Sequence, residues 1–264
     1  MVEEKKINNS FLLSSDTLSW YGLDMVFMLS KDLGFDWIDL ALWNNFDSWN
    51  IDYIKRLVDM YGMPIKVIQL SNNINKKEIQ YALELAKEIN VKNININAPK
   101  YYNRRATKFI ADNLPLYQKT HSNINFNIIN PPKNYLLTLI PQYSFTNIAE
   151  IFKTYKLKVA LDISNIEEDK FDLHLIKKIP NLLPYIPVIY LSDKDKLWKW
   201  HLWLWEWNMK VPTFLKKLKQ LEFDGLFSLK LNIAKKDLSD VDKVKLILKK
   251  SKMYYLENYI NLKI

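Results

Sequence analysis

The chain has 264 residues, of which 48% are hydrophobic and 25% are charged, and its formal net charge is +9. This is the composition of an ordinary globular protein, and we expect a single domain over residues 1–264. The lack of cysteine excludes disulfides, thiol catalysis and cysteine-ligated zinc, and the lack of both GxGxxG and GxxxxGK[ST] motifs removes the main support for dinucleotide and P-loop binding.

Strand-like segments alternate with helix-like segments along the whole chain. Eight strands that are each followed by a helix predict an α/β fold, a closed parallel (β/α)₈ TIM barrel. An open doubly wound sheet is the alternative, and the missing phosphate loop weakens it. In chain order, each strand with the helix after it, the expected segments are Phe11–Ser14 and Tyr21–Leu33, Trp37–Leu42 and Ile51–Tyr61, Ile65–Leu70 and Lys76–Ile89, Val91–Asn97 and Arg104–Tyr117, Ile124–Ile129 and Ser144–Tyr155, Val159–Ile163 and Leu173–Ile179, Val188–Leu191 and Val211–Gln220, and Leu226–Leu231 and Ser239–Leu256.

The charge and hydropathy of the chain indicate which cellular compartment and which classes of partner to expect. No apolar stretch approaches the roughly 20 residues of a membrane span, and residues 1–10 are charged and polar. We therefore expect a cytoplasmic protein without a membrane partner. The lysines are spread over helix-like segments, which favours solvated helix faces over a nucleic-acid surface.

Active sites of (β/α)₈ barrels lie at the carboxyl ends of the strands, so the residues that end each strand are the candidates for function. Here these residues are polar but mostly neutral, and amides alone bind divalent metals poorly. Of three histidines, His121 is expected at the barrel bottom and His174 on a helix, so only His201 lies near the mouth. Strand-end side chains that we expect to contact a substrate are Gln69, Asn97, Asn130, Asn165 and Tyr190.

Four segments resemble the xylose isomerase-like superfamily, which includes sugar isomerases and epimerases, inosose dehydratases and endonuclease IV. The resemblance covers much of the chain, in the right order, and implies a (β/α)₈ barrel related to sugar or sugar phosphate isomerases and epimerases. The segments are Leu29–Leu40, similar to the pattern "lGfdgIEl", Lys156–Asn165, similar to "lDtgH", Val188–Asp193, similar to "vHlsD", and Glu222–Lys230, similar to "gydG.vslE".

The metal-binding positions implied by this resemblance are largely substituted. Asp162 stands where the family places a metal-binding aspartate, whereas Asn165 and Tyr190 stand at histidine positions and Lys230 at a glutamate position. Asp162 and His201 are two potential ligands, and a catalytic divalent site normally has three or more. We therefore expect a degenerate metal site and no cofactor, with manganese, zinc or magnesium as the ions that the resemblance leaves open.

Asp162, His201 and Lys230 are the candidate catalytic residues. Lys230 is expected to pair with Asp162 across the mouth, in place of a metal ion. If it is desolvated, its pKa would fall and its amine would act as a base or form a Schiff base. The alternative is a structural ion pair, or a lysine that extends to solvent.

The segment Trp198–Trp207 contains five tryptophans in ten residues and follows the seventh strand. Trp205 and Trp207 stand where the resemblance places glycines, so these rings should narrow the mouth. Trp205 is a candidate for stacking on a sugar ring. The alternatives are an apolar plug over the barrel or a contact in a homo-oligomer.

Three functional hypotheses follow. The first is a divergent sugar or sugar phosphate isomerase or epimerase, which rests on Asp162 with His201. The second is a non-catalytic barrel that binds a sugar-like ligand or a protein. The third is an endonuclease IV-like nucleic-acid binder, suggested by the net charge and by Arg104 and Arg105, and it ranks last because the chain is poor in metal ligands.

Overall fold

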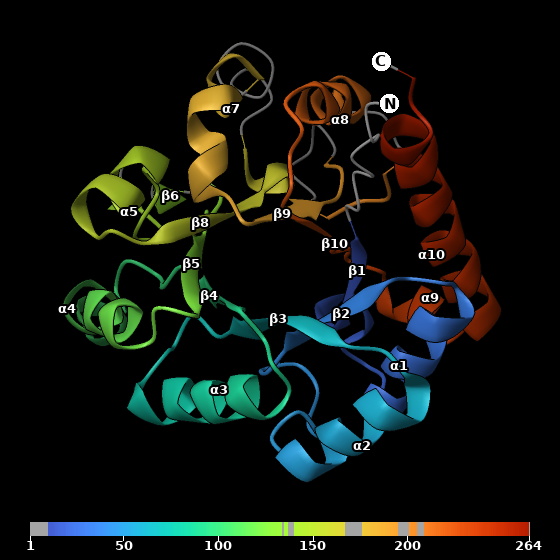
Figure 1. Ribbon diagram of the computed structural model, residues 1–264, viewed down its shortest axis with the longest axis horizontal. Coiled ribbons are helices and arrows are strands. Elements are labelled where there is room, and N and C mark those ends of the chain that lie inside the picture. The colour runs from blue at the N-terminus through green and yellow to red at the C-terminus, as the bar shows by residue number, and fades with distance from the viewer. Residues whose placement is uncertain are drawn as a thin grey trace, which may run out of the picture.

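The computed structural model describes residues 10–133, 135–136, 140–166, 176–194, 201–204 and 209–263. Eight parallel strands close into a barrel, in which the last strand pairs with the first, and helices surround it (Figure 1). The predicted (β/α)₈ barrel is confirmed, and the open sheet is excluded. The barrel strands, in their order around the barrel, are β1 (Phe11–Ser14), β2 (Trp37–Ala41), β3 (Ile65–Leu70), β4 (Asn93–Asn97), β5 (Asn125–Ile129), β8 (Lys158–Asp162), β9 (Val188–Leu191) and β10 (Leu226–Leu229).

The outer layer consists of helices with well-defined starts. Asn50, Asn75, Asn103 and Asp240 each accept a hydrogen bond from the backbone N–H three residues later, which stabilises the first turn of a helix. The principal helices are α1 (Leu23–Asp32), α2 (Ile51–Tyr61), α3 (Lys76–Glu88), α4 (Arg104–Thr120), α5 (Ile148–Thr154), α7 (Ile176–Leu182), α8 (Val211–Gln220) and α10 (Val241–Tyr255). Shorter helical segments are η1 (Ser15–Leu18), η2 (Ile163–Asn165), η4 (Leu183–Tyr185), α9 (Lys235–Leu238) and η5 (Leu256–Ile260).

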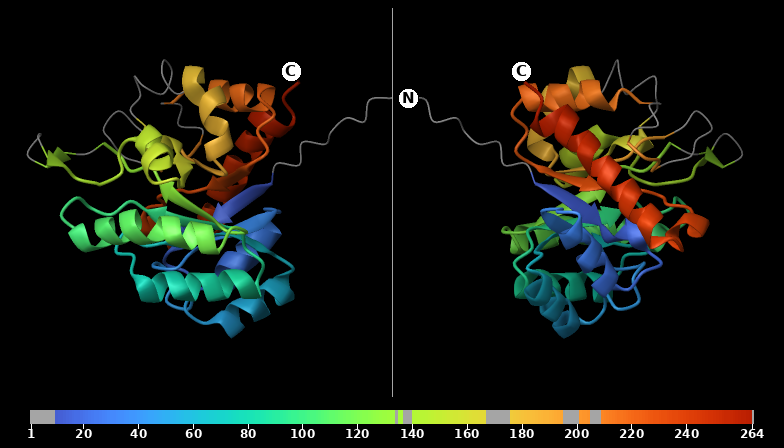
Figure 2. Two further views of the ribbon diagram at one scale, coloured as in Figure 1. Left: turned by 60° about the vertical axis from the view of Figure 1, so that its left-hand side comes forward. Right: turned by 90° about the vertical axis from the view of Figure 1, so that its right-hand side faces the viewer.

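A small antiparallel hairpin interrupts the regular alternation. Its strands β6 (Tyr135–Leu136) and β7 (Ile140–Pro141) lie between β5 and α5 in the sequence and project sideways from the barrel in the left view of Figure 2. The sequence pattern did not predict this hairpin. In the described part of the chain, no helix has both the length and the apolar character that crossing a membrane requires.

Several element boundaries differ from the sequence expectation, for local reasons. The strand expected from Val91 begins at Asn93, because the N–H of Val91 bonds to the carbonyl of Ala86 at the end of α3. The last strand ends at Leu229, because the N–H of Leu231 donates to the hydroxyl of Thr17.

Two further helices differ from the expected segments. The helix expected from Ser144 begins at Ile148, because the N–H of Ser144 bonds to the carbonyl of Pro99. The helix expected over Leu173–Ile179 is described from Ile176 to Leu182, and residues 173–175 lie outside the described part.

The interior of the barrel is unusually polar. Alternate residues of each strand point inward, and branched aliphatic side chains dominate these positions in most (β/α)₈ barrels. Here a small apolar group, including Leu12 and Val188, is accompanied by fully buried polar side chains. This buried polar network lies below the carboxyl ends of the strands and consists of Ser14, Asp39, Gln69, Asn95, Asn127, Tyr190 and Ser228.

Hydrogen bonds join the members of the network across strands. Asn127 Nδ2 donates to Asn95 Oδ1, and Asn95 Nδ2 donates to the Tyr190 hydroxyl, each over 2.7 Å. Gln69 Nε2 donates to Ser14 Oγ over 2.8 Å. Because buried polar groups are costly when unpaired, these bonds make the polar interior tolerable and hold the strands in register.

An aromatic cluster fastens the end of the chain to the place where the barrel closes. The rings of Phe11 and Tyr255 stack at 4.2 Å between centroids, and those of Phe227 and Tyr259 pack edge to face at 4.8 Å. Phe11 lies on β1 and Phe227 on β10, and these two residues are partners in the pairing of the two strands. The α10–η5 segment therefore packs directly over the closing seam.

Candidate active site

A cleft of about 550 Å³ lies at the carboxyl ends of the strands, where (β/α)₈ enzymes carry their active sites. Its lining comes from segments that follow each of the eight barrel strands. The expected site residues among them are Asp162, His201, Lys230, Asn97, Asn130 and Asn165. The other lining residues are Asp16, Trp43, Ser71, Asn72, Asn73, Ala98, Ile129, Pro131, Pro132, Tyr143 and Asn232.

Asp162 presents one engaged and one free carboxylate oxygen. The residue ends β8 and is 1% exposed. Its Oδ1 accepts hydrogen bonds from the backbone N–H and the hydroxyl of Ser164, over 3.2 and 2.8 Å. Its Oδ2 has no hydrogen-bond donor among the described residues and lies 3.6 Å from Nε2 of His201. A buried carboxylate oxygen without a donor is costly, so Oδ2 is an acceptor that the described residues leave unused.

His201 is held in the cleft by its neighbours. Its backbone has a φ of 60°, a conformation uncommon for residues other than glycine, and its carbonyl accepts a 2.7 Å hydrogen bond from the N–H of Asn232. Its Nδ1 lies 3.1 Å from the hydroxyl of Ser192 and 3.3 Å from that of Ser164. Burial lowers the pKa of His201, and attraction by Asp162 does not reverse this, so the ring is neutral at pH 7.

The ion pair that we expected between Lys230 and Asp162 is wrong. Nζ of Lys230 lies 3.2 Å from Oδ2 of Asp16 and 3.4 Å from Oε1 of Gln69. It also lies over two rings, 5.9 Å from the centroid of Trp43 and 5.3 Å from that of Tyr190. Asp16 is available because η1 begins immediately after β1 and turns its first residues over the mouth.

The surroundings of Lys230 raise its pKa, so the geometry favours the alternative of a structural ion pair over a neutral amine. Burial is the largest single influence and would lower the pKa. Attraction by Asp16, Asp162 and Asp39, with the hydrogen bond to Asp16, outweighs burial and raises the pKa of Lys230 above its ordinary value. A neutral amine for base or Schiff-base chemistry is therefore not what this environment favours.

The asparagines that line the cleft have different tasks. Asn130 uses both ends of its amide on the backbone of Asp162, with Oδ1 accepting over 2.6 Å and Nδ2 donating over 3.0 Å. It therefore positions Asp162. Asn165 donates to the carbonyl of Asn130 over 2.9 Å and Asn97 to that of Leu70 over 3.0 Å. Within the described residues, the amide oxygens of Asn97 and Asn165 remain available to a ligand.

Gln69 and Tyr190 were expected to contact substrate, and the structure places them beneath the cleft instead. Both are fully buried in the polar network, where they contact Lys230 from below. Inward-facing residues of a strand lie at different depths in the barrel. Gln69 and Tyr190 lie one layer below the residues that line the cleft. Their role in this geometry is to hold the ammonium ion in place.

The tryptophan segment is described only over residues 201–204. Trp205, the expected stacking residue, lies outside the described part, as do Trp198, Trp200 and Trp207. Of the described residues, Trp203 packs against the main hydrophobic core and Leu204 is fully buried.

Two residues that line the cleft were not among the expected site residues. Asp16 follows the first strand, in η1, and its position after β1 is a signal that could have identified it as the partner of Lys230. Tyr143 lines the cleft from the segment after the β6–β7 hairpin. Its backbone forms an isolated antiparallel bridge with that of Lys100. No local pattern in the sequence indicates that Tyr143 lies at the mouth.

The side chains at the mouth do not fit a catalytic divalent metal. In the described ranges, no three His, Asp or Glu side chains are grouped as metal ligands. Asp162 and His201 are two such groups, and the charge of Lys230 acts on both. A divalent ion next to the buried ammonium ion of Lys230 would be repelled by its charge.

Asp39, inside the polar network, should make stability depend on pH. Burial raises the pKa of Asp39 to about 6, although Ser228, Gln69 and Lys230 partly oppose this. Because the folded-state pKa exceeds the unfolded value, the carboxyl favours the folded state while protonated, and that contribution is lost as pH rises from about 4 through 6. Asp39→Asn should remove this loss, which amounts to roughly 3 kcal/mol.

The measurement is the free energy of unfolding in urea between pH 5 and pH 8. The difference between Asp39→Asn and the unmodified protein should grow in favour of the variant as pH rises. Asp112→Asn, at an exposed aspartate on α4, is the matched control and should show a flat difference. A pH-independent effect of Asp39→Asn would count against a buried titrating carboxyl.

The described geometry defines a (β/α)₈ barrel with a polar cleft at its mouth, and its fold is that of the xylose isomerase-like barrels. A xylose isomerase domain containing protein from Salmonella typhimurium LT2 superposes with a TM-score of 0.68 at 15% identity, over 94% of this chain and 97% of that one. A D-tagatose 3-epimerase-like protein gives 0.66 at 19% identity, over 94% and 98%. A 3-keto-D-glucoside 4-epimerase from E. coli gives 0.66 at 11% identity, over 92% and 100%.

Sequence comparison adds nothing to this structural likeness. No family model matches the chain, and no curated protein matches it. The resemblance seen in the four short segments therefore agrees with the fold.

Proposed function

We propose that the cleft binds a sugar and interconverts its aldose and ketose forms without a metal ion. The observation that carries the proposal is that Lys230 and Asp162 line one cleft, and that Oδ2 of Asp162 has no hydrogen-bond donor among the described residues. An ammonium ion and a carboxylate are the two charges that proton transfer next to a carbonyl group requires.

Asp162 is the proton carrier in this proposal. Its Oδ2 removes the proton from the carbon next to the sugar carbonyl and returns it to the former carbonyl carbon. The proton of the neighbouring hydroxyl passes to the former carbonyl oxygen, so the atoms balance. Ser164, which donates to Oδ1, holds the carboxylate in position, and Nε2 of His201 lies 3.6 Å from Oδ2.

Lys230 stabilises the negative charge that develops on the carbonyl oxygen. Its raised pKa keeps it charged, and its contacts with Asp16, Gln69 and two aromatic rings fix its position before the ligand arrives. A preorganised cation in a site of low polarity contributes more to transition-state stabilisation than the same charge in water.

The number of free carboxylates favours isomerisation over epimerisation. One carboxylate can remove and return a proton on the same face of an enediol intermediate, whereas inversion at one carbon needs a second group on the opposite face. In the described lining, the other carboxylate is Asp16, which is paired with Lys230 and accepts a further hydrogen bond from Asn44.

The rest of the lining suits a polyhydroxylated ligand. Amide groups both donate and accept hydrogen bonds, as hydroxyl groups do, and the ring of Trp43 offers an apolar face.

The same lining also supports a second candidate, a barrel that binds a sugar without converting it. The prevalence of asparagine favours it, because amides bind hydroxyls but transfer no protons. Asparagines of the lining are Asn72, Asn73, Asn97, Asn130, Asn165 and Asn232.

Proton exchange with solvent tests the proposal. Protein treated with EDTA would be incubated in D₂O with glucose, fructose, xylulose and their phosphates, and NMR would follow deuterium at C1 and C2. We expect isomer formation, with deuterium incorporated whenever the proton on Asp162 exchanges with solvent before its return, and neither is changed by EDTA or by added Mn²⁺, Zn²⁺ or Mg²⁺.

The other outcomes are distinct. Activity that appears only with added metal would refute the metal-independent mechanism. Binding in calorimetry without any exchange would favour the non-catalytic barrel, and the absence of binding across the panel would refute both candidates.

A further inference from the structure

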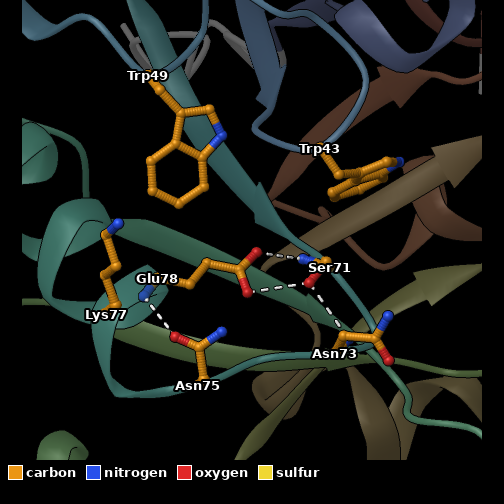
Figure 3. A pocket seen from close by; sticks show the side chains of 7 residues that line it. All are labelled: Trp43, Trp49, Ser71, Asn73, Asn75, Lys77 and Glu78. Atoms are coloured by element: carbon orange, nitrogen blue, oxygen red, sulfur yellow. Dashed lines mark hydrogen bonds between the residues drawn. The ribbon is translucent and has the colours of Figure 1, made fainter.

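A second cavity of about 350 Å³ adjoins the cleft. Trp43, Ser71 and Asn73 line both spaces, so the two are continuous along the loops that follow β2 and β3. Figure 3 shows the rings of Trp43 and Trp49 above a row of polar side chains from the β3–α3 segment. We call this second space the side cavity.

Trp49 gives the side cavity a fixed aromatic wall. Its Nε1 donates a 2.9 Å hydrogen bond to the carbonyl of Leu42, and its ring lies 4.6 Å from that of Tyr81. The Tyr81 hydroxyl in turn donates to the carbonyl of Ser48 over 2.9 Å. The indole is therefore held in place, yet it remains 44% exposed, so a ligand would gain a flat apolar surface without ordering a mobile side chain.

The opposite wall is polar and partly preassembled (Figure 3). Glu78 is 5% exposed, and its carboxylate accepts hydrogen bonds from the backbone N–H and the hydroxyl of Ser71, over 2.8 and 2.9 Å. These two hydrogen bonds hold the Glu78 carboxylate in place on this wall. Asn73, Asn75 and Lys77 stand exposed around it and offer amide and ammonium groups to a ligand.

We infer that the side cavity holds a second sugar ring, joined to the sugar in the main cleft, so that the ligand is a reducing disaccharide. The inference rests on the proposed function and names its substrate class. A pyranose has an apolar face that packs on an indole and a rim of hydroxyls that bond to amide and ammonium groups. The shared residue Trp43 spans the linkage between the two rings, and the reducing unit lies beside Asp162 and Lys230.

Calorimetric titration of cellobiose, maltose, lactose and glucose tests the inference. At least one disaccharide should bind about tenfold more tightly than glucose. Trp49→Ala should abolish that advantage while glucose binding stays unchanged, and Trp49→Phe, which keeps an aromatic face, should retain most of it. Trp20→Ala is the matched control, because Trp20 is 63% exposed, packs on Lys235 and lines neither space.

The inference is overturned if glucose binds but no disaccharide binds more tightly, or if Trp49→Ala leaves the advantage intact. If circular dichroism shows that Trp49→Ala has lost structure, Trp49→Phe and Lys77→Ala provide the test instead. The proposed packing is contradicted if the affinity advantage of the disaccharide over glucose is unchanged in Lys77→Ala and lost in Trp49→Phe. If none of these sugars binds, the inference fails, whereas the proposed function is decided separately by the panel of monosaccharides and their phosphates.

Discussion

Replacing Lys230 by methionine should lower the free energy of unfolding by about 3–5 kcal/mol, because removing one partner of a buried ion pair leaves the other charge uncompensated. The side chain of Lys230 is 9% exposed and that of Asp16 is 20% exposed. Asp39 and Asp162 also lie in its field. Methionine keeps most of the unbranched side chain and removes the ammonium group that lies over the rings of Trp43 and Tyr190, so the effect comes mainly from the charge.

The double variant Asp16→Asn with Lys230→Met is the control for this prediction. It removes the orphaned carboxylate as well, so it should recover much of the lost stability. Urea unfolding at pH 7 measures both variants. If Lys230→Met lowers the free energy of unfolding by less than about 1 kcal/mol, the pair of Lys230 and Asp16 contributes no more to stability than an exposed ion pair does.

Asp162→Asn should reduce isomer formation by about 10²- to 10⁴-fold, the range that a positioned general base contributes. The asparagine keeps an oxygen for the two hydrogen bonds from Ser164, so the local structure should persist. What it loses is the lone pair that accepts the proton. Sugar affinity should change only a few-fold, because the ground-state contacts of the cleft remain.

Asn232→Ala is the matched control for the base. Asn232 lines the same cleft and holds the carbonyl of His201 through its backbone, which the substitution leaves intact. Turnover in this variant should stay within about tenfold of the unmodified protein, as expected for loss of one ligand hydrogen bond. Equal rates in Asp162→Asn and the unmodified protein would remove Asp162 from the mechanism.

The fold was largely predictable because its signal is distributed over the whole chain. Two signals do not depend on the exact boundary of any single element. One is the series of eight strand–helix pairs, and the other is the alternation of polar residues along a strand, as at Asn93, Asn95 and Asn97. The hairpin of β6 and β7 was not predictable in this way. Its strands have two residues each, which is too short for any periodicity.

The site was only partly predictable because depth and partner choice depend on three-dimensional packing. Position at a strand end correctly brought Asp162, His201 and Lys230 to one cleft. It did not distinguish Gln69 and Tyr190, which face inward but lie a layer below the surface. Nor did it choose between Asp16 and Asp162 as the partner of Lys230, since both follow strands and the decision rests on a few ångströms.

The pairing of β1 with β10 has a consequence for how the protein is made. Of the barrel strands, β1 is synthesised first, and it finds its second neighbour only when residues 226–229 have been synthesised. Until then the growing sheet carries two open edges, and its polar interior faces solvent. Open edges invite pairing with other chains, so the nascent protein passes through its most aggregation-prone state just before the barrel closes.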